Sequence, residues 1–371
     1  MSRTKRIAIV GAGVAGMALA ILATKRGYQV TLFERYSKIS SMGAGVTLWP
    51  NAMFVMHQMG LGKEMEKLGG APQLMCQFDR HGNLQTEFDI ATVNSLCGFI
   101  SVSVLRRDLM NVLAGLLNDL GVEIRFDCSI TAAKVTELAE QHDLVVGADG
   151  RMSSVVRESL FENKVTPEYH GFLNIIGISR QRKHTLDNTI CDFRGLGQRF
   201  GIVPVNDEWC YWAGAWKSPI DNNPPQQYWY DELCRRFQHW PQPVQNVLQY
   251  CDRTSVNRIF VHDIDPLPYW HKDNVVIIGD AAHAALPTSG QGACQALEDA
   301  WHLVRLLTEN AELEVVLRTF YQQRNAKTSA AQLVGRQLAN QIFSQQPEPR
   351  LPSSHISASD LSQFWMQGLR L

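Results

Sequence analysis

A glycine-rich turn near the start of the chain has the spacing of a phosphate-binding site. Its residues are Gly11, Gly13 and Gly16, with Val14 and Ala15 between the last two glycines. The turn follows an apolar run at 7–10 and precedes a second apolar stretch, which predicts a strand before it and a helix after it. The free amide groups at the start of that helix would face a pyrophosphate.

An acidic residue at the end of the next predicted strand extends this site. Residues 28–33 read as that strand, Glu34 closes it and Arg35 follows. A carboxylate at this place accepts hydrogen bonds from a ribose diol and suits an unphosphorylated 2′-hydroxyl. We therefore predict an ADP-containing cofactor, such as FAD or NAD, bound by the turn, Glu34 and Arg35.

Two later segments combine glycine with aspartate at the end of a buried apolar strand. An aspartate there can hold a polyol hydroxyl, and the helix that opens after the second segment offers free amides and the positive end of a dipole. The segments are Gly147-Ala148-Asp149-Gly150 and Gly279-Asp280, the latter continuing to His283, Pro287 and Gly290-Gln291-Gly292.

With these motifs the chain resembles the group A flavoprotein monooxygenases, the para-hydroxybenzoate hydroxylase-like or salicylate hydroxylase-like family. The resemblance extends from Ile7 to about Tyr321. It implies an α/β fold in which a Rossmann-type FAD-binding domain is interleaved with a smaller, mostly β substrate domain. It also narrows the cofactor to FAD and indicates an enzyme.

The resemblance implies a cofactor contact for each motif. Asp149, with Ser153, resembles the central Asp-Gly motif of the family, and Asp280 would bind the ribitol chain of FAD. The later helix start would stabilise negative charge on the flavin pyrimidine ring. Its residues are Gly290, Gln291, Gly292 and Ala293.

Further flavin contacts follow from the same resemblance. Arg106 is similar to the arginine that braces FAD near its diphosphate, although the neighbouring Arg107 could take that role. The loop Gly43-Ala44-Gly45-Val46 would line the isoalloxazine edge. Gly45 and Val46 are the predicted contacts, and small residues there would leave clearance for flavin movement.

Three residues are candidates for the catalytic centre. Pro287 would form part of the wall where oxygen meets the flavin, next to Gly45 of the loop. His283 could act as a general base, or it could be a packed histidine of the motif.

At two positions the chain departs from the family pattern. An arginine usually stands seven residues after the aspartate of the central motif, where this chain has Val156 and then Arg157. Cys294 occupies a place that is often Asn or Asp. The first departure puts a nicotinamide contact in doubt, whereas the second leaves the backbone amides of the helix start intact.

The resemblance implies FAD-dependent monooxygenation. NADH or NADPH would reduce FAD, O2 would form a flavin C4a-hydroperoxide, and one oxygen atom would pass to a small aromatic or heteroaromatic substrate. Epoxidation, N-hydroxylation, Baeyer–Villiger oxidation and a non-catalytic flavin-binding redox protein are the alternatives. Aromatic residues of the β domain are candidates for the substrate pocket: Phe193, Tyr211, Trp212 and Trp216.

The change from βαβ patterning to short alternating strands predicts two interleaved domains. The FAD-binding domain would comprise residues 1–72, 98–165 and 266–345, and the substrate domain residues 73–97 and 166–265. A tail at 346–371 is rich in Pro and Ser, and its end, 361–371, could dock as a short apolar segment.

Composition limits the partners. The net charge of the 371 residues is −1 and no run of like charges occurs, so we expect small organic molecules, O2 and NAD(P)H rather than nucleic acid. Residues 7–24 resemble a membrane span, but three glycines interrupt them, and we expect no membrane segment. The eight cysteines lack metal-ligand spacing, which predicts no metal site and a reducing, cytoplasmic location. A monomer or homodimer is expected.

Overall fold

The computed structural model describes residues 5–40, 43–162, 164–181, 186–309, 312–343 and 356–369. One of its two main sheets is the parallel sheet that the first motif predicts. Its order is β14-β15-β8-β1-β2-β7, with only β14 antiparallel. The strands are β1 (Arg6–Val10), β2 (Gln29–Phe33), β7 (Glu123–Arg125), β8 (Leu144–Gly147), β14 (His271–Lys272) and β15 (Val275–Ile277).

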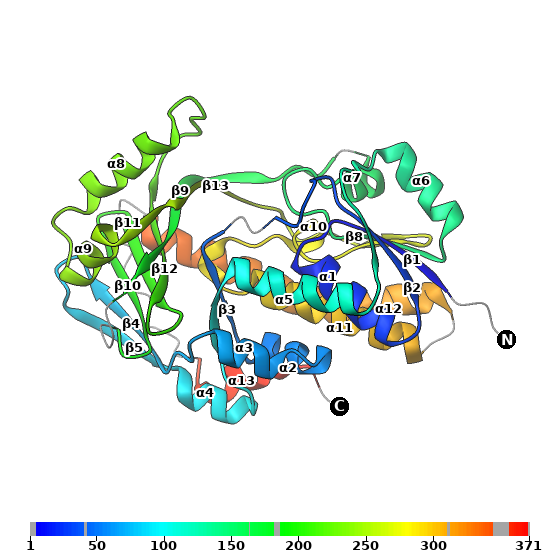
Figure 1. The fold of residues 1–371 in the computed structure, drawn as a ribbon, viewed down its shortest axis with the longest axis horizontal. Coiled ribbons are helices and arrows are strands. Elements are labelled where there is room, and N and C mark those ends of the chain that lie inside the picture. The colour runs from blue at the N-terminus through cyan, green and yellow to red at the C-terminus, as the bar shows by residue number, and fades with distance from the viewer. Residues whose placement is uncertain are drawn as a thin grey trace.

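Helices cover both faces of this sheet, as a parallel sheet requires. Strands β1 and β8 are apolar along their length and almost wholly buried. One layer consists of α1 (Val14–Lys25), α5 (Arg106–Asp119) and α11 (Gly292–Glu309), which pack together. On the other side, α6 (Ala132–Gln141) and α7 (Val155–Phe161) pack against β8 (Figure 1).

A larger sheet of seven strands forms the other end of the molecule (Figure 1). Its order is β13-β9-β12-β11-β10-β4-β5, and every pairing except that of β10 with β4 is antiparallel. The strands are β4 (Leu74–Asp79), β5 (Leu84–Asp89), β9 (Glu168–Arg180), β10 (Thr189–Gly195), β11 (Gln198–Pro204), β12 (Trp209–Lys217) and β13 (Cys251–Asp263).

This part of the chain differs from its sequence-based description in two ways. Strands β9 and β13 are 13 residues long rather than short. Two helices that we did not predict, α8 (Gln226–Phe237) and α9 (Gln242–Gln249), follow the proline-rich break and pack on one face of the sheet.

A two-stranded sheet lies between the two large sheets (Figure 1). It pairs β3 (Gly45–Leu48) with β6 (Val102–Leu105), so Gly45 and Val46 of the predicted glycine-rich loop belong to a strand, whereas Gly43 and Ala44 precede it. Helices α2 (Pro50–Met59) and α3 (Gly62–Leu68) follow β3.

The C-terminal third returns to the first sheet. After β15 come α10 (Asp280–His283), a short 3-10 helix at Pro287–Ser289, α11 and the long α12 (Leu313–Phe343). Helix α13 (Ala358–Met366) docks beside α4 (Ile90–Cys97) and overlaps the start of 361–371, the segment that we expected to dock. Residues 344–355, 370 and 371 lie outside the described residues. No described helix is long and apolar enough to cross a membrane.

Candidate functional site

The three motifs predicted from the sequence converge because β1, β8 and β15 are parallel neighbours that end at the same edge. Gly11 has φ +104°, and a Cβ there would lie 2.4 Å from the carbonyl oxygen of Ala148, at the end of β8. Gly279, with φ +59°, follows β15, and its Cβ would lie 3.0 Å from that of Ala15 in α1. Each glycine thus permits a close backbone approach between two motifs.

The other two glycines of the turn have different surroundings. A Cβ at Gly16 would lie 2.0 Å from the carbonyl oxygen of Gly11, so only glycine allows α1 to pack this closely on β1. A Cβ at Gly13 would have no neighbour within 4 Å. Gly13 is the N-cap of α1 and makes no side-chain cap, so the open side of the turn lies at the positive end of the helix. Val14 and Ala15, which follow, are buried.

Glu34 lies beside this turn, as predicted from its position after β2. Its Oε2 accepts a hydrogen bond from the amide of Ala12 at 2.9 Å, and its Oε1 accepts one from the amide of Tyr36 at 3.0 Å. The buried carboxylate is therefore fixed in orientation next to Gly11 and Gly13. Arg35 is exposed, and its guanidinium lies 5.2 Å from the centre of the Tyr36 ring.

Asp149 is bound to the first turn of α7. Its carboxylate accepts hydrogen bonds from the Ser154 hydroxyl at 2.6 Å and from the Val156 amide at 3.2 Å. Burial raises the pKa of the Asp149 carboxyl, and these two bonds oppose that rise. Ser154, rather than the Ser153 that we named, is the partner of this aspartate, and it also caps α7.

Arg157, one position later than the family pattern, is buried beside the central motif. Its guanidinium is buried and donates to the carbonyl oxygens of Arg151 at 2.6 Å and Ala281 at 3.1 Å. Arg157 belongs to the first turn of α7, directly after the Asp149 loop. Arg157 thereby ties the Asp149 loop to α10, a role that our sequence reading missed.

Arg106, not Arg107, faces the site. Its aliphatic chain lies against Gly43, where a Cβ would be 2.5 Å from Arg106 Cδ. Burial lowers the pKa of Arg106. The negative charge of Asp280 opposes this shift, and the positive charge of Arg151 adds to it. Both residues are therefore close enough to Arg106 for their charges to act on it. Arg107 is exposed and stacks on Trp209, 5.7 Å from its ring.

The two halves of the second motif lie together. A Cβ at Gly292 would be 3.9 Å from Oδ1 of Asp280, so that carboxylate borders the start of α11. Gln291 is buried, and its Oε1 accepts from Asn51 at 3.0 Å. Among the described residues, its Nε2 has no hydrogen-bond partner. Gly292 and Ala293 are partly exposed.

Comparison with known proteins agrees with this arrangement. A family model described as an FAD binding domain matches residues 4–332. The chain belongs to this family of FAD-binding monooxygenases. The assignment confirms the predicted fold class, the FAD cofactor and the enzyme class.

Individual relatives support the same class. An FAD-dependent urate hydroxylase of Mycolicibacterium vanbaalenii is 30% identical over 80% of this chain and 78% of its own length. A 3-amino-4-hydroxybenzoate 2-monooxygenase of Streptomyces cremeus is 30% identical over 92% and 89%. Klebsiella pneumoniae HpxO complexed with FAD and uric acid has the same fold, with a TM-score of 0.81, 24% identity and coverage of 92% and 90%.

The residues present in this FAD-binding chain fit an FAD molecule. The open side of Gly13 and the helix dipole suit a diphosphate, and the fixed Glu34 carboxylate suits a ribose diol. The Nε2 of Gln291 is a buried donor without a hydrogen-bond partner among the described residues. Leaving such a donor unpaired costs about 1–3 kcal/mol. A flavin carbonyl oxygen would satisfy it.

His283 lies in the interior of the FAD-binding domain and cannot serve as the general base that we considered. It is 4% exposed, packs against the Trp270 ring, and its Nε2 lies 2.5 Å from Oδ2 of Asp299. Burial would raise the pKa of Asp299, but the charges of His283 and Arg324 hold it at about 2. The histidine is thus the packed alternative.

One face of the large sheet meets the FAD-binding domain at two places. On β12, the Tyr211 ring touches Gly45, and four residues further along the strand Ala215 packs in a cluster with Leu286, next to Pro287. Four residues of strand span about 13 Å. Ala213, between these two contacts, is partly exposed and pairs with partly exposed Gly201 of β11. Two small, partly exposed residues therefore lie between the two contacts on this face.

Of the four predicted pocket aromatics, only Tyr211 is on this face. Trp212 and Trp216 alternate with it along β12, and Phe193 lies on the same opposite face. All three are buried in a core beneath α8 and α9. Our assignment of these three rings to the pocket is wrong, because the helices cover that face of the sheet.

Charged residues that we did not single out lie on the same face of the sheet. Asp192 of β10 is buried and bound by Arg199 at 2.6 Å and by Arg194 at 2.7 Å. Although burial raises the pKa of Asp192, the two arginine charges lower it overall. The guanidinium of Arg199 extends over Gly201, 3.6 Å from where a Cβ would stand.

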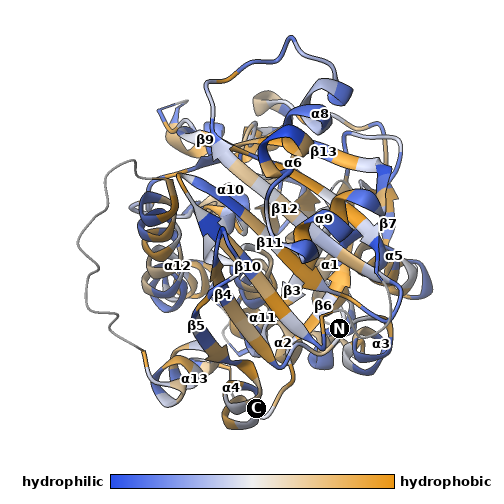
Figure 2. Cartoon of the chain, turned by 90° about the vertical axis from the view of Figure 1, so that its left-hand side faces the viewer, coloured by the Kyte–Doolittle hydropathy of each residue, from blue (hydrophilic) through white to orange (hydrophobic). Residues whose placement is uncertain are grey.

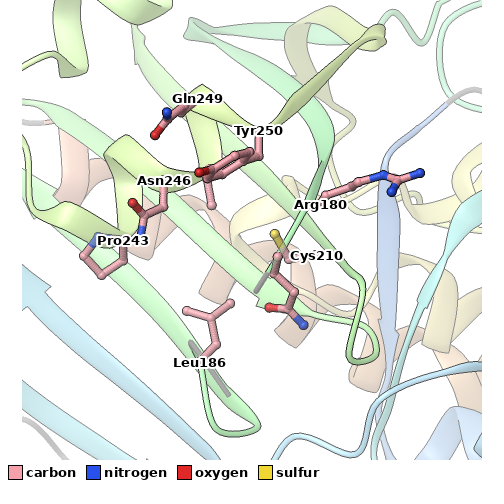
Figure 3. A pocket seen from close by; sticks show the side chains of 9 residues that line it. Arg180, Leu186, Cys210, Pro243, Asn246, Gln249 and Tyr250 are labelled. Atoms are coloured by element: carbon pink, nitrogen blue, oxygen red, sulfur yellow. The ribbon is translucent and has the colours of Figure 1, made fainter. Parts of the chain in front are cut away.

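A surface cavity of about 300 Å³ lies elsewhere. Figure 3 shows that it is lined by residues such as Cys210, Asn246 and Tyr250. Cys210 precedes Tyr211 on β12 and points to the α9 side, so the sheet separates this cavity from Gly45. We therefore do not assign the substrate to it.

Proposed function

We propose that this enzyme hydroxylates a small aromatic or heteroaromatic compound with O2 and NADH or NADPH. The balanced reaction consumes substrate, O2, NAD(P)H and one proton, and it yields hydroxylated product, NAD(P)⁺ and water. Two relatives support this substrate class, because one is a urate hydroxylase and the other a 3-amino-4-hydroxybenzoate 2-monooxygenase.

The proposed cofactor contacts are those predicted from the sequence. When bound, FAD supplies the transfer of electrons from the nicotinamide and the activation of O2. The chain supplies binding groups, orientation and a shielded space. The residues proposed to hold FAD are Gly11, Gly13, Val14, Ala15, Gly16, Glu34, Arg35, Gly45, Val46, Arg106, Asp149, Asp280, Gly290, Gln291, Gly292 and Ala293.

The observation that carries the proposal is the double contact of β12 with the FAD-binding domain. Both segments expected beside the flavin, at Gly45 and at Pro287, border the same sheet face. A planar substrate over Ala213 would lie between them. Tyr211 would bound one end of the substrate, and Arg199 would favour a polar or anionic substituent.

The Tyr211 hydroxyl lies in a short chain of hydrogen-bonded hydroxyl groups. It is 2.8 Å from the Thr47 hydroxyl, which is 3.1 Å from that of Ser103. Burial raises the pKa of Tyr211, with the bond to Thr47 opposing that rise. The neutral phenol therefore acts as a hydrogen-bonding group and not as a base.

A reducing, cytoplasmic location also fits. All eight cysteines are free thiols, and burial raises the pKa of Cys191, Cys210, Cys251 and Cys294 to about 12. Such thiols are poor nucleophiles and resist oxidation. We propose that the protein is a monomer or a homodimer.

A compound screen tests this function. Purified FAD-loaded enzyme is given NADH or NADPH with urate, 3-amino-4-hydroxybenzoate or 6-hydroxynicotinate, and both nucleotide oxidation and peroxide release are measured. We expect at least one compound to accelerate oxidation without an equal yield of peroxide. Equal peroxide with every compound, across a wider aromatic set as well, would refute the proposal.

A further inference from the structure

Helix α13 contributes none of the residues proposed to hold FAD. It lies beyond residues 4–332, which the family model matches. Both views place it beside α4, and it also contacts α2 (Figure 1, Figure 2). A helix of nine residues is too short to be stable alone, so docking must hold it in place. Trp365 is its principal buried side chain.

A first route connects Trp365 to the second flavin motif through a ring contact. The centre of its ring lies 5.1 Å from that of Trp49, at the start of α2. The indole Nε1 of Trp49 donates a hydrogen bond to the carbonyl oxygen of Gly290 at 3.0 Å. Gly290 has φ +64° and directly precedes Gln291, so this bond fixes the peptide that leads into α11.

A second route runs through buried polar groups. The carbonyl oxygen of Trp365 accepts from Lys327 Nζ at 2.6 Å, and the same ammonium lies 2.8 Å from Oε2 of Glu298. Oε1 of Glu298 accepts from Asn51 at 2.6 Å, and Asn51 also donates to Gln291 at 3.0 Å. Lys327, Glu298 and Asn51 are each at most 3% exposed, and in such surroundings hydrogen bonds are strong and directional.

The two routes end on adjacent residues, Gly290 and Gln291. We propose that α13 is a positioning element of the flavin site, in which Trp365 sets the geometry of the start of α11. The inference rests on the proposed contact between that helix start and the flavin. Its physical basis is that free amides and a helix dipole stabilise a reduced, negatively charged flavin only when they are correctly aimed.

Four single substitutions test this role. Trp365→Ala removes the ring contact, Trp365→Phe keeps an aromatic ring, and Trp49→Phe keeps the ring but removes the hydrogen bond to Gly290. Gln363→Ala, on the exposed side of α13, is the matched control. For each, the affinity of the apoprotein for FAD is measured by quenching of flavin fluorescence, and the midpoint potential of the bound flavin by titration with a reductant.

We expect weaker FAD binding and a more negative potential in Trp365→Ala and Trp49→Phe, with Trp365→Phe close to wild type. Loss of outer groups that orient ligands lowers metal affinity by about 10- to 100-fold, and we expect roughly tenfold for FAD in Trp365→Ala. Gln363→Ala should match wild type in both measurements.

Wild-type affinity and potential in both Trp365→Ala and Trp49→Phe would overturn the inference. A lower melting temperature with unchanged potential would also overturn it, because α13 would then only stabilise the fold. If Trp365→Ala does not fold, Trp49→Phe decides. Neither readout needs turnover, so an enzyme that binds FAD but hydroxylates nothing would refute the proposed function and leave this test valid.

Discussion

The ring of Tyr211 lies directly against the backbone of Gly45. A Cβ added to Gly45 would stand 2.1 Å from Cδ1 of Tyr211, closer than any real contact. The Tyr211 hydroxyl also binds Thr47, two residues further along the same strand. One tyrosine of the large sheet is therefore fixed on the strand that we place at the flavin edge.

This contact predicts the effect of Gly45→Ala. The new methyl group must displace the Tyr211 ring, and misplacement by about 1 Å can cost 100-fold in rate. We expect kcat/KM for the best compound of the screen to fall at least tenfold.

A double-mutant cycle checks that cause. In a Tyr211→Ala background the methyl group has room, so Gly45→Ala should add little further loss. Independent, additive losses in the two variants would show that the collision with Tyr211 is not responsible.

The glycines of the first turn should separate cofactor binding from folding. Gly13→Val places a side chain on the open side of the turn, so the purified protein should lose its yellow colour while the apoprotein melts near the wild-type temperature. Gly16→Ala collides with the Gly11 carbonyl and should destabilise the apoprotein by about 1–3 kcal/mol. A fully flavin-loaded Gly13→Val protein would contradict the proposed diphosphate site.

Ala213→Leu should block the substrate without disturbing the cofactor. Its added atoms stand between Tyr211 and Ala215 on the face proposed for the substrate, so we expect a higher KM for the substrate and an unchanged affinity for FAD. Lys217→Leu, on the same side of β12 but exposed at its end, is the control. Equal KM values for both variants would place the substrate elsewhere.

His302 gives a testable dependence of stability on pH. Burial, and then the charge of Arg324, lower its pKa from 6.5 to about 3. As the pH falls, His302 therefore takes up a proton in the unfolded chain before it does so in the folded protein. The free energy of unfolding falls as the pH drops from 6.5 towards 3. The free energy of unfolding should lose about 1.4 kcal/mol per pH unit from this group.

Urea unfolding of the apoprotein at several pH values measures this loss. His302→Gln removes the titrating group, so its stability should fall less steeply than that of wild type over the same range. Parallel curves for the two proteins would show that His302 is not buried in its neutral form.

The parallel sheet and its cofactor motifs could be predicted because local rules determine them. Gly11 and Gly16 stand where a Cβ would collide with a backbone carbonyl oxygen, Gly279 has a positive φ beside Ala15, and apolar runs mark the strands. The family resemblance then named FAD and the fold class, and both are confirmed.

Long-range packing decided what could not be predicted. The alternation along β12 showed that Tyr211 and Trp212 lie on opposite faces, but only the unpredicted α8 and α9 reveal which face is covered. The pairing of β3 with β6 turns a glycine-rich segment into a strand. The link from Trp365 to Gly290 joins residues far apart in sequence, which no local pattern records.

Isotopically labelled dioxygen tests the central claim most directly. The enzyme, with FAD and NADH or NADPH, is given the compound that best couples nucleotide oxidation, and the mass of the product is measured. We predict one labelled oxygen atom in each product molecule made by the wild-type enzyme. In Ala213→Leu, the labelled product should be lost together with the activity. A product whose new oxygen comes from water would contradict the monooxygenase function proposed for this site.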